Sequence, residues 1–324
     1  MESAPQVMPD PMASPSTRAS SVLIGRQDYL SVLLRLTEME LYKIRRRTMS
    51  KVLSSISIIA TLSLFGLIAL AAFLAINNGT SPENVRNFTE ALRLPRSLVL
   101  IEQLLLTLGQ ILIIILVSTI VGGEYNSGTI RLMLTRGPSR TQFLLSKVGA
   151  AITCIGLGVV AITVLGVLTG LLLNLATGVA PDFVFFSATW SVHVLLYLLI
   201  IILGLFTYGM MALFLSTLGR ATATGLAGVL TWSFLIEPVI EVISNFGRNI
   251  SGPTGSFFQS LPDYLIGTNI SALLGNQSQY VFPTSSVAQI APVSDLHALL
   301  VLAAYIVIFI GLAWWVTMRR DVTN

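Results

Sequence analysis

Six long apolar runs decide what this chain can fold into. Each holds roughly the 20 residues that a helix needs to cross a bilayer. Only 10% of the 324 residues are charged, against about 25% in a soluble domain. The sequence therefore predicts an all-α integral membrane protein, with one transmembrane domain over residues 52–320. Its six expected spans are Val52–Ile76, Leu98–Val121, Val148–Leu175, Val192–Leu215, Ala221–Ile243 and His297–Met318.

The fifth run differs from the others because it meets Glu237-Pro238 near its end. Proline lacks a backbone N–H and its ring clashes with the preceding helical turn. We therefore expect the fifth helix to kink or to end at this point.

The region before the first run divides in two. Residues 1–24 are rich in Ser, Pro, Ala and Met without an apolar period, which predicts a disordered tail and not a cleaved signal peptide. In residues 25–51, Leu30, Leu33 and Leu41 recur near helical spacing, and basic residues gather toward the end. This pattern indicates an amphipathic helix lying in the membrane plane. The alternative is a basic stop that only fixes orientation.

Lys and Arg indicate the orientation. If the N-terminus is cytoplasmic, 15 of the 19 Lys and Arg residues lie inside and four lie outside. This bias predicts that both termini are cytoplasmic. It also places the long segment 244–295 outside. That segment carries several large apolar side chains, so we expect it to fold against the outer mouth, either as a cap over an exit path or as a lid that shields the helix ends.

The connector between the second and third runs, residues 122–147, is polar, basic and longer than a simple turn requires. Ile130, Met133 and Leu134 fall at helical spacing and predict a short helix with an apolar face. Gly137-Pro138 breaks that helix. Ser139, with Gln142 three residues later, is typical of a capping box that opens a new helix at Arg140. We interpret the connector as a segment that presents a small helix to a partner in water, namely a separate ATPase.

The chain lacks the sequence motifs of several enzyme classes. It has no G-x-x-x-x-G-K-[ST] to cradle nucleotide phosphates, no H-E-x-x-H and no G-x-S-x-G. Its one cysteine is Cys154, and its two histidines, His193 and His297, lie near the ends of apolar runs. We therefore expect no enzyme activity, metal, cofactor or nucleic-acid partner for this chain alone.

A few polar residues lie within or beside the runs. Glu102 and Gln110 are eight residues apart, close to one helical face. Ionisable groups at membrane depth are candidates for function, so these two could line a passage. Glu237 and Glu241 could form an acidic rim at its mouth. The alternatives are a headgroup-level Glu102, a Gln110 that bonds a neighbouring helix, and solvated residues at the helix end.

Gly166 and Gly170 form a G-x-x-x-G pair in the third run. Small residues at this spacing let two helices approach closely. The pair indicates either packing within the chain or contact between two copies.

The order of these parts resembles a known family. An amphipathic basic helix leads into the first span, and the connector carries Glu124, Gly128-Thr129, Pro138-Ser139-Arg140 and Lys147. This is similar to the permease subunit of a type-2 ABC exporter from a bacterium or archaeon, over residues 28–320. The segment after the fifth run is longer than in many members of that family.

The resemblance implies a site and partners. The connector would carry a coupling helix seated in a groove of the ATPase subunit, with the amphipathic connecting helix nearby. The implied contact residues are Ile130, Arg131, Met133, Leu134, Arg136, Pro138, Ser139 and Arg140. The implied loop anchors are Glu124, Gly128, Thr129 and Lys147, and the candidate pathway or mouth residues are Glu102, Gln110 and Glu237.

The resemblance also implies a complex in the plasma membrane. Two ATPase subunits holding ATP and Mg would act on this chain and on a second permease chain, identical or a sibling. Tilting of the first, second and fifth spans would move an amphipathic, lipid-like or drug-like cargo outward. The alternatives are a transporter or channel that works without an ATPase, and a membrane sensor or scaffold that transports nothing.

Overall fold

The computed structural model describes residues 29–79, 81–128, 139–177, 187–247, 249–250, 252–282 and 293–319. These residues form helices and no strands. Six helical stretches are long and apolar enough to cross a membrane, as the sequence predicted. They are Thr48–Asn77, Ser97–Asn126, Arg140–Ala176, Ala188–Gly219, Thr222–Gly247 and Asp295–Arg319.

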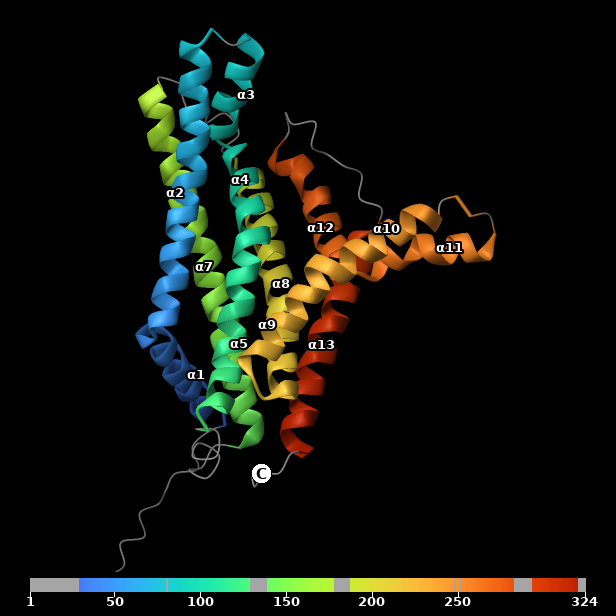
Figure 1. Cartoon of the computed structure of the whole chain (residues 1–324). Coiled ribbons are helices and arrows are strands. Elements are labelled where there is room, and N and C mark those ends of the chain that lie inside the picture. The colour runs from blue at the N-terminus through green and yellow to red at the C-terminus, as the bar shows by residue number, and fades with distance from the viewer. Residues whose placement is uncertain are drawn as a thin grey trace, which may run out of the picture.

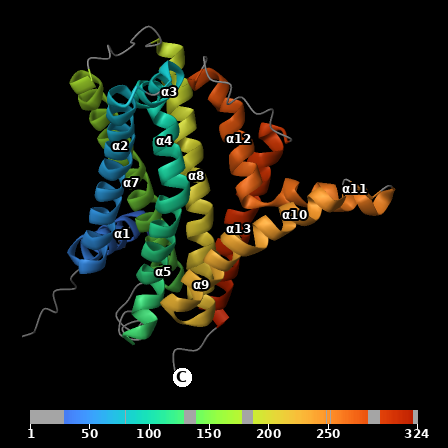
Figure 2. The same cartoon turned by 45° about the horizontal axis from the view of Figure 1, so that its top comes forward.

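The fifth stretch, Thr222–Gly247, leans away from the bundle, and the other five stand side by side (Figures 1 and 2). Helix α8 lies at the centre and packs on α5, α9, α13 and the shorter helix α12 (Ile266–Val281). The bounds are α2, Thr48–Asn77; α4, Ser97–Leu104; η1, Leu105–Gly109; α5, Gln110–Asn126; α7, Arg140–Thr177; α8, Ala188–Gly219; α9, Thr222–Thr231; η2, Trp232–Ile236; α10, Glu237–Gly247; and α13, Asp295–Arg319.

The helix before the first span, α1, covers Tyr29–Arg46, within the predicted range 25–51. It crosses one end of the bundle, at the bottom of Figure 1. We call this the α1 end. The chain bends at Arg47, and Thr48–Lys51 belong to α2. The opposite end carries the short helix α3 (Pro82–Leu92), and we call it the α3 end.

The glycine pair of the third span packs within the chain. A Cβ at Gly166 would lie 2.7 Å from Ile101 on α4, and one at Gly170 would lie 3.3 Å from Phe65 on α2. Asn174, one turn further along α7, donates to the Leu92 carbonyl oxygen at 3.1 Å. Of the two interpretations of this motif, the structure supports close packing of α7 against its own neighbours.

The fifth span does not end at Pro238. Helical structure continues through this proline to Gly247, and the stretch just before it, η2, is a π-helix. A π-helix is bonded from i to i+5 and often occurs as a single wide turn within an α-helix. This wide turn accommodates a residue that cannot donate to the ordinary ladder, so the helix need not stop there.

The last helix of the fifth span, α10, and the long segment that follows it form two parts. Helices α10 and α11 (Pro253–Ser260) pack on each other and project sideways from the bundle in both views (Figures 1 and 2). After the short helix η3 (Leu261–Tyr264), α12 (Ile266–Val281) packs on α8 and α13. Leu273 and Leu274 are buried there. This segment therefore folds against the bundle through α12, as its apolar residues predicted, whereas the α10–α11 arm stands apart.

Candidate coupling site

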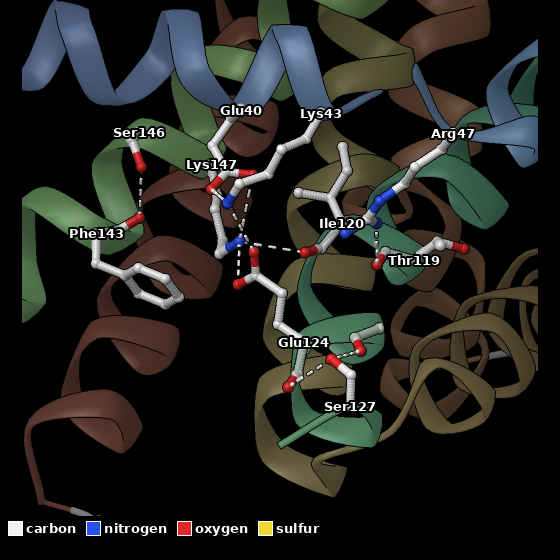
Figure 3. A network of polar contacts seen from close by, with 11 residues as sticks. Glu40, Lys43, Arg47, Thr119, Ile120, Glu124, Ser127, Phe143, Ser146 and Lys147 are labelled. Atoms are coloured by element: carbon white, nitrogen blue, oxygen red, sulfur yellow. Dashed lines mark hydrogen bonds and ion pairs between the residues drawn. The ribbon is translucent and has the colours of Figure 1, made fainter. Parts of the chain in front are cut away.

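Four charged side chains from three helices meet at the α1 end. They are Glu40 and Lys43 of α1, Glu124 of α5 and Lys147 of α7, and we call them the Lys147 cluster. Figure 3 shows Lys147 reaching between the two carboxylates. Its Nζ lies 2.6 Å from Glu124 Oε2 and 3.7 Å from Glu40 Oε2. Lys43 Nζ lies 2.8 Å from Glu40 Oε1 and 3.3 Å from Glu124 Oε1.

The cluster is buried and its formal charges balance. Glu40, Glu124 and Lys147 are 6%, 2% and 1% exposed, and the partly exposed Lys43 completes two acids and two bases. A buried charge needs a partner of opposite sign and hydrogen bonds to offset the loss of water. Lys147 Nζ also donates to the Ile120 carbonyl oxygen at 3.2 Å and lies 4.6 Å from the centre of the Phe143 ring.

The sequence of α1 positions Glu40 toward the bundle. Leu33, Thr37, Glu40 and Ile44 recur every three or four residues, so they share one face of the helix. This face packs on α7. Gly149 allows the close approach, because a Cβ there would lie 3.2 Å from Thr37 Cγ2 and Oγ1.

A second bond ties the α1–α2 bend to α5. The Arg47 guanidinium donates to the Thr119 carbonyl oxygen at 3.2 Å, as Figure 3 shows. The start of the first span is thereby joined to the end of the second, beside the Lys147 cluster. Helices α1, α5 and α7 are thus linked by packing, ion pairs and hydrogen bonds.

The structure describes both ends of the predicted connector but not its middle. At the first end, Gly128 follows α5 with a φ of +66°, the left-handed conformation that commonly terminates helices. At the second end, Ser139 and Gln142 form the predicted capping box. The Gln142 N–H donates to Ser139 Oγ at 3.2 Å, and the Ser139 N–H donates to Gln142 Oε1 at 3.1 Å. The predicted residues Thr129, Ile130, Arg131, Met133, Leu134, Arg136 and Pro138 lie outside the described residues.

Arg140, predicted to contact the ATPase, has partners within the chain. Its guanidinium donates to the carbonyl oxygens of Thr317 and Met318 at 3.2 and 3.0 Å. These carbonyls belong to the last turn of α13, where a helix favours a cation. Arg140 therefore joins the start of α7 to the end of the sixth span.

Of the candidate pathway residues, Glu102 is paired with α8. It accepts a hydrogen bond from the Tyr197 hydroxyl through Oε2. Gln110 is half-buried at the start of α5, beyond the π-helix η1. Gln110 is not part of the Glu102–Tyr197 pair, and the role of the two residues in a passage stays a prediction.

Glu237 is neither part of an acidic rim with Glu241 nor a solvated residue at a helix end. It is 5% exposed, whereas Glu241 is exposed. Its carboxylate accepts from the Tyr208 hydroxyl at 2.8 Å, from Trp232 Nε1 at 2.7 Å and from the Gly267 N–H at 3.3 Å. We call this group the Glu237 cage. It joins α8, the fifth span and the first turn of α12.

Both histidines have hydrogen-bond partners. His193 Nδ1 lies 3.0 Å from Gln277 Oε1, and its ring stacks on Tyr280 at 4.4 Å. His297 Nε2 lies 3.0 Å from the Asp263 carbonyl oxygen. They serve to hold α12 and η3 to the ends of the spans.

Sequence reasoning identified Glu124 and Lys147 but missed their partners on α1. Glu40 could have been found, because it is the one charged residue on the face formed by Leu33, Thr37, Glu40 and Ile44. The donors of the Glu237 cage were missed too. Trp232 precedes Glu237 by five residues. Side chains at this spacing face each other in a π-helix, and no sequence rule predicts a π-helix here.

The comparison with protein families agrees with this architecture. The family described as ABC-2 family transporter protein matches residues 42–322, from the last residues of α1 past the end of α13. No curated protein matches the chain. The matched range holds all six candidate spans, the α5 and α7 members of the Lys147 cluster and the Glu237 cage. This multi-pass membrane protein therefore belongs to the ABC-2 family of transporter proteins and is a permease component without a nucleotide-binding motif of its own.

Proposed function

We propose that this chain is the permease subunit of an ATP-driven exporter and that force from a separate ATPase enters it at the α1 end. The supporting observation is the Lys147 cluster. It joins three helices beside the two points where the connector leaves the bundle, after Gly128 and before Ser139. A push on the connector at this place would move the start of the first span, the end of the second and the start of the third together.

The mechanism is mechanical. Two ATPase subunits, each holding ATP and Mg, close on one another. The connector, seated on one of them through residues such as Met133 and Leu134, follows. Because Lys147 is ion-paired to both Glu124 and Glu40, the movement reaches α1 as well as α5 and α7. Tilting of the first, second and fifth spans then opens a path for an amphipathic, lipid-like or drug-like cargo.

In this proposal the α1 end faces the cytoplasm and the α3 end faces outward. The distribution of Lys and Arg supports this orientation. Both termini then lie on the cytoplasmic side of the plasma membrane of a bacterium or archaeon. Six spans enclose little space, so a second permease chain, identical or a sibling, completes the passage. Helix α12, held by the Glu237 cage, lies on the outward side of the fifth span and shapes the exit.

Affinity capture from native membranes tests the proposal. The tagged chain should retain an ATPase, identified in the captured material by its Walker A sequence. Met133→Asp places a charge on the apolar face of the predicted coupling helix and should abolish capture. Arg140→Glu should weaken it. Arg86→Glu, a charge reversal on the exposed side of α3, is the matched control and should leave capture unchanged.

Two results would overturn the proposal. One is unchanged capture and unchanged ATP-driven transport in the Met133→Asp variant. The other is cargo movement by the purified chain in proteoliposomes without an ATPase, which would favour a transporter that works alone. A chain that moves no cargo with the ATPase present but binds an external ligand would be a sensor.

A further inference from the structure

A groove of about 330 Å³ runs between α2, α5 and α7 near the α1 end. Its volume falls in the range of small-molecule sites, about 300–1,000 Å³. Small side chains line two of its walls. They are Ser50, Ser54 and Ser57 on α2 and Cys154, Gly158 and Ala161 on α7.

The small residues explain why the groove is open. A Cβ at Gly158 would meet no atom within 4 Å, so α2 and α7 do not close over this position. The Ser57 hydroxyl donates to the Leu53 carbonyl oxygen of its own helix at 3.1 Å. Its hydrogen-bonding capacity is thereby used within α2, and the wall suits an apolar occupant. Next to a bilayer, a hydrocarbon chain fits such a space.

Two cations, Arg47 and Lys51, lie between or next to the groove residues Ile44 and Ser50 in the sequence. Lys51, which is exposed, follows the groove residue Ser50 on α2. Arg47, at the α1–α2 bend, reaches α5, where its guanidinium donates to the Thr119 carbonyl oxygen, one turn beyond the groove residue Leu116. Glu40 lies near Arg47 in the sequence, and Glu124 lies near its partner Thr119. Both acids are already paired with lysines in the Lys147 cluster.

We propose that this groove binds one anionic phospholipid of the surrounding bilayer. One acyl chain lies between α2 and α7, and the phosphate lies between Arg47 and Lys51. We infer an anionic lipid from the charge of the site, because a basic site next to an apolar groove favours a headgroup of net negative charge. The lipid packs beside the α1–α2 bend and fills the space between the first and third spans. This site does not depend on the ATPase or on the identity of the cargo.

The test is native mass spectrometry of the purified full chain in detergent, titrated with phosphatidylglycerol or with phosphatidylcholine of the same chain length. The anionic lipid should bind more tightly. Lys51→Gln should weaken binding of phosphatidylglycerol about fivefold, the effect of one cation near a headgroup, and leave phosphatidylcholine binding unchanged. Equal affinity for both lipids in the wild type would overturn the proposal.

A second pair of variants tests whether the acyl chain occupies the groove. Gly158→Leu adds a side chain whose Cβ would meet no atom within 4 Å, so it should fill the groove and remove the bound phosphatidylglycerol. Gly156→Leu is the matched control. Its Cβ also meets no atom within 4 Å, but Gly156 does not line the groove, so binding should persist. Equal lipid binding by the two variants would contradict the proposal.

Cross-linking of the wild type gives a readout that does not depend on a variant. Phosphatidylglycerol with a diazirine on one acyl chain should label peptides of α2 and α7 that contain Ser54 and Cys154. Labelling confined to other helices would overturn the assignment.

Discussion

Two buried carboxylates of this protein are stabilised in different ways. Glu124, at the α1 end, lies 2.6 Å from a lysine ammonium and 3.3 Å from a second one. Glu237, in the fifth span, is held by neutral donors, namely a phenol, an indole and a backbone N–H. Both are nearly inaccessible to solvent, so the difference lies in the partners and not in the degree of burial.

This difference indicates how rigidly each site holds its helices together during a movement. In the Lys147 cluster every member is a full charge, so removal of one member leaves like charges together in a medium of low dielectric constant. This makes the joint of α1, α5 and α7 intolerant of separation. In the Glu237 cage the donors are dipoles on three elements, and loss of one leaves two. We therefore expect the first site to act as a rigid joint and the second as a graded support for α12.

Lys147→Met should have the largest effect. It leaves Glu40 and Glu124 facing each other with only Lys43 between them, and loss of one partner of a buried ion pair costs about 3–5 kcal/mol. The unfolding midpoint in detergent should fall sharply. Lys147→Met combined with Glu124→Gln removes the unpaired charge and should recover much of the loss. Equal midpoints for the single and double variants would show that charge pairing is not what stabilises this joint.

Tyr208→Phe should have the next largest effect. It removes one donor to the buried Glu237 carboxyl group, and a buried acceptor that loses its partner costs about 1–3 kcal/mol. The control is Tyr305→Phe. The Tyr305 hydroxyl donates to the neutral Tyr264 carbonyl oxygen at an exposed position, so its loss should cost about 0.5–1.5 kcal/mol. Chemical unfolding of both variants in the same detergent measures the two costs, and a larger cost for Tyr305→Phe would refute the role of the cage.

Gly122→Ala tests the close approach of α5 to the start of the fifth span. A Cβ there would lie 2.3 Å from the Thr222 backbone nitrogen, so backbone must shift, at a cost of about 1–3 kcal/mol. Gly123→Ala is the matched control, because its Cβ would lie 3.7 Å from the nearest atom, on Arg47. Thermal unfolding should separate the two variants, and identical midpoints would mean that α5 and α9 are not in contact as described.

The smallest effect is expected at the α3 end. Arg86 Nε and Arg96 Nη1 lie 2.6 and 2.5 Å from the Glu90 carboxylate, and the hydrogen bond from Arg86 lowers the pKa of Glu90. A carboxylate with a lowered pKa in the folded state stabilises above its unfolded pKa, and this contribution is lost as the pH falls through the folded pKa. The small difference in unfolding midpoint between wild type and Glu90→Gln should therefore be present at pH 7 and vanish at strongly acidic pH. If the difference in unfolding midpoint grew on acidification, the ionised Glu90 would not be the form that stabilises the fold.

The spans could be predicted from sequence because their signal is local. The length and apolarity of a run such as Val192–Leu215 can be read within the run itself. The capping box at Ser139 likewise lies within four residues. The Lys147 cluster depends on contacts across more than 80 residues, from Lys43 to Glu124, which no local pattern contains. The Glu237 cage depends in addition on a π-helix, whose register alters which side chains face each other.

The most direct test of the account is a disulfide across the α1–α7 joint. A Cβ at Gly149 would lie 3.8 Å from Thr37 Cβ, within the range of about 3.5–4.5 Å that disulfides require. Thr37→Cys and Gly149→Cys in a Cys154→Ser background leave no other thiol in the chain. ATP hydrolysis by the complex in nanodiscs is then compared before and after oxidation. If α1 and α7 move as one body, the cross-linked protein should retain its activity. If oxidation abolishes hydrolysis and reduction restores it, α1 must slide on α7 during the cycle and the joint is not rigid.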